Sequence, residues 1–501
     1  MLIPGDSLVY LESNDLGKTI GAITESKAFL QEAKSKPDLS VLNGIKLAVA
    51  VTGFETTEEK VTEENSILNF QPHFVAVVET NAWNFQALSF TENKLGEFIN
   101  DVYGGGIELE TSDKPDGKYF VWTAQDGRKA YALVQGSVIF FGNDASSIDK
   151  CLAVKRGEAD SIVKDAKITA LPADSLAAGY ASPDGVAQIA NMAGMSMAKS
   201  SSEEGEVQSF VARVLPELLR NSVNDMIWTS ANTDAGIEDK ILIGTKPEVG
   251  KVFSETLVPS DDTYSKLAIF LPTGLNSVTQ YNLKDPQIAW RSILLTAEKQ
   301  TDAVSGKLLV GFSGSLFEPY GIESPEVFLQ SVEPQIITAK FDTEGEKVVV
   351  IARVKDAANI KTSIAKEINF LKPPEIIDFA DVWKSESGEY AAAFVDNAIV
   401  LGDAEGVLAC LQARINYEKT PGYPLQYSDP KYVSISFARD AEIAGKIAEL
   451  LADKKDAKEV AAAISITETS FAKTGIERRT VSDFGLIGSI IEQLGKDDKD
   501  E

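Results

Sequence analysis

One pattern occurs twice in this chain, and this repetition constrains the fold more than any other feature. The two cysteines, Cys151 and Cys410, each lie in an apolar segment that follows a tyrosine and then a glycine. The tyrosines, Tyr131 and Tyr390, stand at the same distance before their cysteines. The glycine is expected to mark a turn from a strand into a helix. The same strand, turn and helix are therefore predicted in both halves.

Four more segments recur in the same order. The paired segments, first copy against second, are 3–10 and 271–281, 44–51 and 306–312, 72–79 and 334–341, 131–151 and 390–410, and 229–238 and 469–477. Such an ordered series predicts a tandem duplication of one module. Within each copy, a proline-containing segment recurs before a further strand and helix, which predicts a larger unit followed by a smaller one.

Turn residues separate the predicted strands. Asp116-Gly117 and Asp126-Gly127 flank a run of aromatic and β-branched residues and are typical of hairpin turns. Strands that are joined by tight turns pair antiparallel. Helical patterns occur singly after groups of strands. The predicted class is therefore α+β, a tandem duplication of a module with mainly antiparallel sheets and helices packed on one face.

The length and the linker-like segments suggest four units. A chain of 501 residues holds three or four domains at about 150 residues each. Polar, acidic stretches at 199–206 and 496–501 predict a linker and a solvated tail, and 55–65 predicts a surface loop. The predicted units are 1–166 (larger, first copy), 167–262 (smaller, first copy), 263–420 (larger, second copy) and 421–501 (smaller, second copy, with the acidic tail).

The charge excludes one class of partner. The chain has 48 basic and 75 acidic residues, and its net charge is −27. Nucleic acids and anionic membranes are bound by clustered lysine and arginine, so a polyanion repels them. No nucleic-acid partner is expected, whereas a protein partner or self-association is.

The two cysteines are expected to be free. They occupy matching positions in two copies, so they should lie in separate cores, and each has apolar neighbours that suit a small buried hydrophobe.

No apolar run is long enough to span a bilayer, and no transmembrane segment is expected. The opening residues carry neither a basic nor an apolar signal region. Two interpretations follow: a cytosolic protein, or a periplasmic or extracellular protein whose signal peptide has been removed.

The residues that commonly carry chemistry are sparse. His73 is the only histidine, and the predicted second copy has Gln335 in its place, so a structural role is expected. Carboxylate pairs could act as acid and base. The candidate pairs are Asp113 and Asp116, Asp261 and Asp262, and Asp378 and Asp381. Calcium binding at Asp113–Gly117 is a minor alternative to a simple turn.

Other motifs have structural interpretations. The glycines at 104–106 follow a predicted helix and are expected to end it, not to hold a phosphate. Met192 and Met195 share a helix face, either as core or as a binding lip. The helix at 94–102 is expected to bury one stripe, formed by Leu95, Phe98, Ile99 and Val102. The scattered tryptophans are expected to be structural anchors: Trp83, Trp122, Trp228, Trp290 and Trp383. No catalytic, cofactor-binding or metal-binding residue is assigned, and no cofactor is expected.

The opening segment 2–12, the Ala-Tyr-Ala strand and the Gly142-Asn-Asp turn before Cys151 carry a resemblance. On these residues the chain resembles an uncharacterised exported bacterial family, a domain of unknown function from Acidobacteria-like lineages. The resemblance implies a precursor with a signal peptide and an extracytoplasmic location. It transfers no catalytic residue.

Three functions are compatible with the sequence. The leading hypothesis is a non-enzymatic scaffold or protein-interaction protein of the bacterial envelope. The alternative is a carrier of an apolar ligand held between helices and sheet. The third is a carboxylate-based hydrolase.

Overall fold

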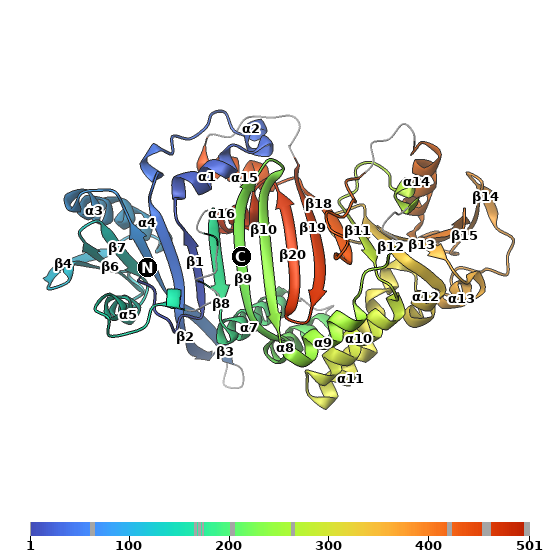
Figure 1. Ribbon diagram of the computed structural model, residues 1–501, viewed down its shortest axis with the longest axis horizontal. Helices are drawn as coiled ribbons and strands as arrows, with labels where there is room; N and C mark the ends of the chain where they lie inside the picture. The colour runs from blue at the N-terminus through green and yellow to red at the C-terminus, as the bar shows by residue number, and fades with distance from the viewer. Residues whose placement is uncertain are drawn as a thin grey trace.

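The computed structural model describes residues 2–60, 66–164, 168, 172, 175–200, 206–261, 266–417, 423–452 and 462–494. Its strands belong to one sheet in which every pairing is antiparallel, and helices accompany the sheet throughout (Figure 1). The predicted α+β class with antiparallel strands is confirmed at this level.

The strands of the first half are β1 (Val9–Ser13), β2 (Lys46–Lys60), β3 (Ser66–Glu79), β4 (Glu108–Lys114), β5 (Gly117–Thr123), β6 (Lys129–Gln135), β7 (Val138–Gly142), β8 (Ala177–Ala181), β9 (Val223–Thr233) and β10 (Gly236–Thr245). Those of the second half are β11 (Ser277–Asn282), β12 (Val332–Lys340), β13 (Val348–Val354), β14 (Glu375–Ile377), β15 (Ala380–Lys384), β16 (Tyr390–Val395), β17 (Ala398–Asp403), β18 (Ser434–Asp440), β19 (Ala463–Ala472) and β20 (Gly475–Ser482).

The helices of the first half are α1 (Leu16–Thr24), α2 (Lys27–Glu32), α3 (Asn84–Phe90), α4 (Gly96–Val102), α5 (Ala145–Lys155), α7 (Pro183–Ser200), α8 (Glu206–Ser222) and α9 (Pro247–Thr256). Those of the second half are α10 (Pro286–Lys299), α11 (Ala303–Phe312), α12 (Pro325–Ser331), α13 (Ala357–Ser363), α14 (Ala404–Ile415), α15 (Ile443–Leu451) and α16 (Gly485–Leu494). Two short 3-10 turns, η5 (Ser313–Leu316) and η6 (Glu318–Tyr320), follow α11.

The strand order runs outward from the pairing of β10 with β20. In one direction the sequence of neighbours is β10-β9-β8-β1-β2-β3-β7-β6-β5-β4. In the other it is β20-β19-β18-β11-β12-β13-β17-β16-β15-β14. Each half therefore presents its ten strands in the same order, and the two halves meet edge to edge at the centre of one sheet.

This order corrects two of the segment matches expected from the sequence. The segment 306–312 lies in the helix α11 and is not a strand opposite β2. By position in the sheet, β2 corresponds to β12 and β3 to β13, so His73 on β3 and Gln335 on β12 are not equivalent. The cause is the longer segment between β11 and β12, here called the inserted segment, which forms α10, α11 and α12 where the first half has α1 and α2 between β1 and β2. A short apolar run in this segment fits a strand or a helix equally well.

Helices cover both faces of the sheet, contrary to the expected packing on one face. In the first half, α5 packs on Leu133 and Phe140, whereas α3 and α4 pack on the side chains that alternate with them. In the second half, α14 and α12 likewise lie on opposite faces. A strand that is apolar on both sides, such as β17, must be covered twice, and the burial of Ala398–Leu401 shows this.

The two cysteine helices begin in the same way. Asp144 accepts a hydrogen bond from the Ser147 amide at the start of α5, and Asp403 accepts one from the Gly406 amide at the start of α14. A glycine precedes each helix because the backbone of the neighbouring strand lies too close to leave room for a side chain. A Cβ atom at Gly142 would lie 2.4 Å from the carbonyl oxygen of Phe74, and one at Gly402 would lie 2.2 Å from that of Val348.

The helix expected at 94–102 is longer and differently oriented. It continues from α3 through a π-helical turn at Thr91–Leu95 into α4. The extra residue in that turn rotates α4, so Ile99 is buried while Phe98 and Val102 are 56% and 51% exposed. The predicted buried stripe is wrong at these two positions.

The three predicted unit boundaries, at 166/167, 262/263 and 420/421, lie outside the described residues. Strand pairs join predicted units: β1 with β8 joins the first and second, β10 with β20 the second and fourth, and β11 with β18 the third and fourth. Of the helices in the described ranges, none is both long and apolar enough to cross a bilayer.

Candidate ligand-binding site

Helix α10 has a hollow on each side. Asp285 caps the helix by accepting a hydrogen bond from the Ile288 amide, and Pro286 occupies its first turn. One side of α10 faces α9, and the other faces the strands β11 and β12. Because the two hollows use different side chains of one helix, each can be altered without the other.

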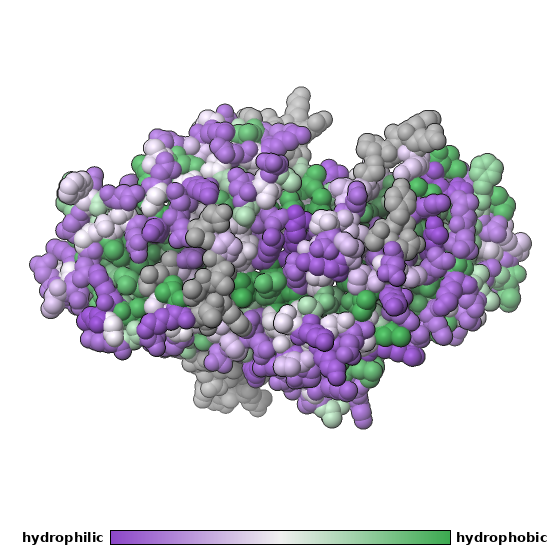
Figure 2. All heavy atoms as spheres, in the orientation of Figure 1, coloured by the Kyte–Doolittle hydropathy of each residue, from purple (hydrophilic) through white to green (hydrophobic). Residues whose placement is uncertain are grey.

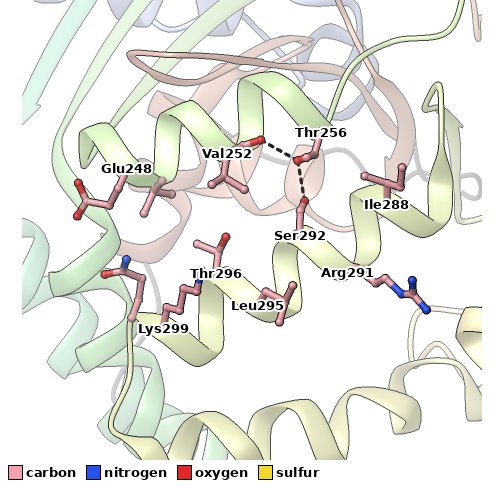
Figure 3. A pocket seen from close by; sticks show the side chains of 11 residues that line it. Glu248, Val252, Thr256, Ile288, Arg291, Ser292, Leu295, Thr296 and Lys299 are labelled. Carbon is pink, nitrogen blue, oxygen red and sulfur yellow. Dashed lines mark hydrogen bonds between the residues drawn. The ribbon is translucent and has the colours of Figure 1, made fainter.

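The first hollow is an open groove of about 370 Å³ between α9 and α10 (Figure 3). Val249, Val252 and Leu295 contribute apolar walls, and charged side chains such as Lys299 stand at its rim. Thr256 Oγ1 lies 2.8 Å from Ser292 Oγ and 2.8 Å from the carbonyl oxygen of Val252. These contacts tie α9 of the first half to α10 of the second.

The second hollow is a cavity of about 320 Å³ between the sheet and the helices of the inserted segment. It is lined by Tyr281, Leu283, Pro286, Ala289, Trp290, Ile293, Leu316, Phe317, Tyr320, Ile322, Phe328, Leu329, Ile336, Thr338 and Val350. No member of this set is charged. A concave, mainly apolar chamber with few polar groups is the usual form of a small-molecule site.

Aromatic rings form much of the wall. The rings of Trp290 and Phe317 meet edge to face, with their centroids 5.1 Å apart. Phe328 is 1% exposed and anchors this wall in the core beneath α12. Ile293 lies on α10 at the border of the cavity and is 39% exposed. The cavity thus combines a buried aromatic floor with a partly open side.

Three hydroxyl groups gather in the cavity. They belong to Tyr281 of β11, Thr338 of the paired strand β12 and Tyr320 of η6, and all three residues line the cavity. Burial raises the pKa of both tyrosines, and it outweighs the lowering by the nearby Thr338 side chain. Both phenols are therefore neutral at pH 7. Tyr281 is nevertheless 37% exposed, so this polar group can be reached by a molecule in the cavity.

His73 lies away from this cavity, on β3. Its Nε2 is 3.4 Å from Glu55 Oε2, and its Nδ1 is 3.8 Å from Asp144 Oδ2. Asp144 also accepts from the hydroxyl groups of Ser146 and Ser147. A catalytic triad needs the serine to bond with the histidine, but here the serines bond with the aspartate. The arrangement is that of a capped helix start.

None of the candidate carboxylates that the structure describes lines the cavity. Asp116 is 3.6 Å from Arg156, at the turn between β4 and β5. Asp378 occupies the turn between β14 and β15, and Asp381 lies on β15. Asp262 falls outside the described residues. Within the described part of the chain, no group of three histidine, cysteine or acidic residues could hold a metal ion.

The cysteines behave as expected. Both are free and fully buried, and they belong to separate core clusters, one under α5 and one under α14. Burial raises the pKa of the Cys151 thiol to about 12 and raises that of Cys410 as well. Neither is poised as a nucleophile.

The other small motifs are partly confirmed. Gly104 and Gly105 have positive φ angles and donate to Asp101 and Asn100, which ends α4 as predicted. Met192 is 38% exposed, and the side chain of Met195 lies outside the described part.

Two exposed apolar surfaces escaped the sequence interpretation. The first, here the α3–α4 surface, consists of Trp83, Phe85, Phe90 and Phe98, which are 75%, 69%, 54% and 56% exposed. Trp83 is thus no buried anchor, unlike Trp122, Trp228 and Trp383. The rotation at the π-helical turn brings Phe98 to this surface, and periodicity alone could not reveal it.

The second surface, here the β14–β15 tip, consists of Leu371, Ile376 and Phe379, which are 97%, 69% and 85% exposed. Hydrophobic side chains reach the outline of the molecule at this end in Figure 2, whereas hydrophilic ones cover most of the face shown. Phe379 has a φ of 62°, a strained value for an aromatic residue. Arg414 holds the turn by donating to the Asp378 carbonyl and to the Asp396 carboxylate.

Comparison with known proteins gives no functional assignment. No family model matches the chain, and no curated protein matches it. Among solved structures, crystal form IV of TP0453 is similar at a TM-score of 0.24 and 8% identity, over 51% of this chain and 83% of its own. That score is too low to assign a common fold.

Proposed function

We propose that this protein is a non-enzymatic binding protein that holds a small apolar ligand in the cavity between α10 and the sheet. The cavity carries this proposal, because it has a largely aromatic and aliphatic lining, three hydroxyl-bearing residues and no charged wall residue. The absence of a charged lining residue leaves the cavity without a strong acid or base. The carboxylate-based hydrolase is therefore the least supported of the three functions.

The α9–α10 groove is a weaker site for a small molecule. It is open along its length, and charged side chains border it, including Glu248 and Lys299. It serves instead as a built-in control, since Leu295 lines the groove while Ile293, two residues earlier on α10, lines the cavity.

The test is a titration with naphthalene, a rigid apolar probe, followed by thermal unfolding. A ligand that binds only the folded state stabilises it by about 2.7 kcal/mol when its concentration is 100 times Kd. Ile293→Trp should fill the cavity and abolish the stabilisation. Leu295→Trp, with a side chain 53% exposed on the other side of α10, should retain it. Equal behaviour of the two variants, or no stabilisation of the wild type, would refute the proposal.

The leading hypothesis from the sequence, a scaffold or interaction protein of the envelope, stands as the second candidate. It is supported by the α3–α4 surface and the β14–β15 tip, which expose large apolar side chains on an otherwise acidic protein. Native mass spectrometry of gently purified protein separates the candidates. A retained small adduct that Ile293→Trp loses supports a carrier, whereas a clean monomer mass argues for the scaffold.

An origin by tandem duplication is also proposed. The identical order of ten strands in each half supports it, and so do the matching cysteine helices. The extracytoplasmic location rests only on the resemblance to the uncharacterised exported family.

A further inference from the structure

We infer that the cavity selects neutral molecules with one oxygen function, in preference to purely apolar molecules and to carboxylates of the same shape. This inference rests on the proposed function. It concerns which ligand the cavity takes, and it depends on the charge and position of the groups that line the cavity.

The first step is the uncharged lining. None of the charged residues of α10 lines the cavity, and two of them, Arg291 and Lys299, border the groove on the α9 side. Arg291 is also paired with Glu326, with Nε 3.0 Å from Oε1. A carboxylate in the cavity would lose its water without gaining a cation, and burial of an uncompensated charge is strongly unfavourable.

The second step is the grouping of the hydroxyls. Tyr281 comes from β11, Thr338 from the paired strand β12, and Tyr320 from η6 of the inserted segment. All three side chains line the same cavity, although they come from different elements. The remaining lining residues are apolar except for the indole of Trp290. The cavity therefore has one group of hydroxyls to which a ligand can hydrogen-bond, and its other walls are mainly apolar.

The third step is the protonation state. Since burial raises the pKa of both phenols, each hydroxyl can donate as well as accept at neutral pH. An alcohol, ketone or ether oxygen finds a donor here. A ligand without oxygen leaves the hydroxyl cluster unmatched.

Three probes of similar shape test this selectivity by isothermal titration calorimetry at pH 7: naphthalene, 2-naphthol and 2-naphthoate. One additional hydrogen bond should make 2-naphthol bind about three- to tenfold more tightly than naphthalene. The anion should bind at least about tenfold more weakly than naphthalene, because its charge is desolvated without a partner.

A triple variant removes the polar group as a unit: Tyr281→Phe, Tyr320→Phe and Thr338→Val. Removing the partners together avoids leaving one buried hydroxyl unmatched. The variant should bind naphthalene as the wild type does and should lose the preference for 2-naphthol. Thr279→Val is the matched control. Thr279 on β11 lies opposite Thr338 of β12, but it bonds with the Ser436 hydroxyl and does not line the cavity.

The outcomes separate the two proposals. If naphthalene binds the wild type and 2-naphthol binds no more tightly, or if 2-naphthoate binds as well, the selectivity inference is overturned and the binding function remains. If none of the three probes binds, the proposed function fails with it. The wild-type comparison decides the matter even if the triple variant does not fold.

Discussion

Replacing Arg479 should weaken the junction between the two halves of the sheet. Arg479 lies on β20 opposite Lys240 of β10, in the strand pair that joins the halves. Its guanidinium contacts Glu238 of the first half at 2.6 Å and Glu468 of the second at 2.9 Å. Glu468 is only 3% exposed at its side chain, so removal of the cation leaves a buried carboxylate without its counter-charge.

The loss in free energy of unfolding on replacing Arg479 lies between two limits. Breaking a fully buried ion pair costs about 3–5 kcal/mol, and losing an exposed pair costs about 0.2–1 kcal/mol. The Arg479 side chain is 27% exposed, and Glu468 keeps two hydrogen bonds from Ser428. We therefore expect Arg479→Met to destabilise the protein by about 2–3 kcal/mol.

The assay is urea unfolding followed by circular dichroism, with hydrogen exchange of β10 and β20 as a local measure. Arg478→Met is the matched control, because the adjacent Arg478 is exposed and has no ion pair with a described residue. It should change stability by less than about 0.5 kcal/mol. Indistinguishable midpoints for the two variants would show that the junction does not depend on this ion network.

The effect should also depend on pH. Burial opposes ionisation of Glu238, but hydrogen bonds from Lys240 and Arg479, with their charges, lower its pKa overall. A carboxyl group with a lowered folded-state pKa contributes stability above its unfolded value, near 4.3, and that stability is lost as the pH falls through the folded value. The difference between wild type and Arg479→Met should therefore shrink below about pH 4. A constant difference down to pH 3 would contradict this assignment.

Three further predictions concern other parts of the molecule. Because Cys151 and Cys410 are buried with raised pKa values, a thiol reagent should label neither in the native protein at pH 8 and both after denaturation; rapid native labelling would contradict the packing. Gly402→Ala should cost more than about 2 kcal/mol, because its φ is 142° and a Cβ would collide with Val348, whereas Gly53→Ala, with open space, should cost about 1 kcal/mol or less; thermal unfolding compares them. On the α3–α4 surface, replacing Trp83 and Phe98 with serine should leave the melting temperature nearly unchanged but reduce self-association or partner capture in sedimentation; unchanged association would remove this surface from the scaffold hypothesis.

Local chemistry made part of the fold predictable. The Asp-Gly pairs at 116–117 and 126–127 mark the turns on both sides of β5. The cysteines were recognisable as core residues from their apolar neighbours. These features depend on residues close in sequence, where turn geometry and helix capping act.

The matching of the halves was less predictable. An apolar run such as 306–312 satisfies the composition of a strand, yet it forms α11, because its environment in the inserted segment decides between the two. The same limit applies to Phe98. One extra residue in a π-helical turn moved it from the expected core stripe to the surface.

The candidate site could not have been predicted from the sequence alone. Its polar group joins Tyr281, Tyr320 and Thr338, which come from two strands and a 3-10 turn, and its walls come from residues between 281 and 350. No spacing motif links them, since their proximity arises only when the inserted helices close over β11 and β12.

The sequence by itself determined the local elements: antiparallel strands at turn residues, capped cysteine helices, and a strongly acidic chain without clustered basic residues. Tertiary structure alone decided the edge-to-edge junction at Arg479, the covering of both sheet faces and the uncharged cavity beside α10. The physical reason is the distance along the chain over which the deciding contacts act. Turns and caps are settled by contacts within a few residues, whereas junctions and cavities depend on how distant apolar surfaces pack and on which gaps that packing leaves.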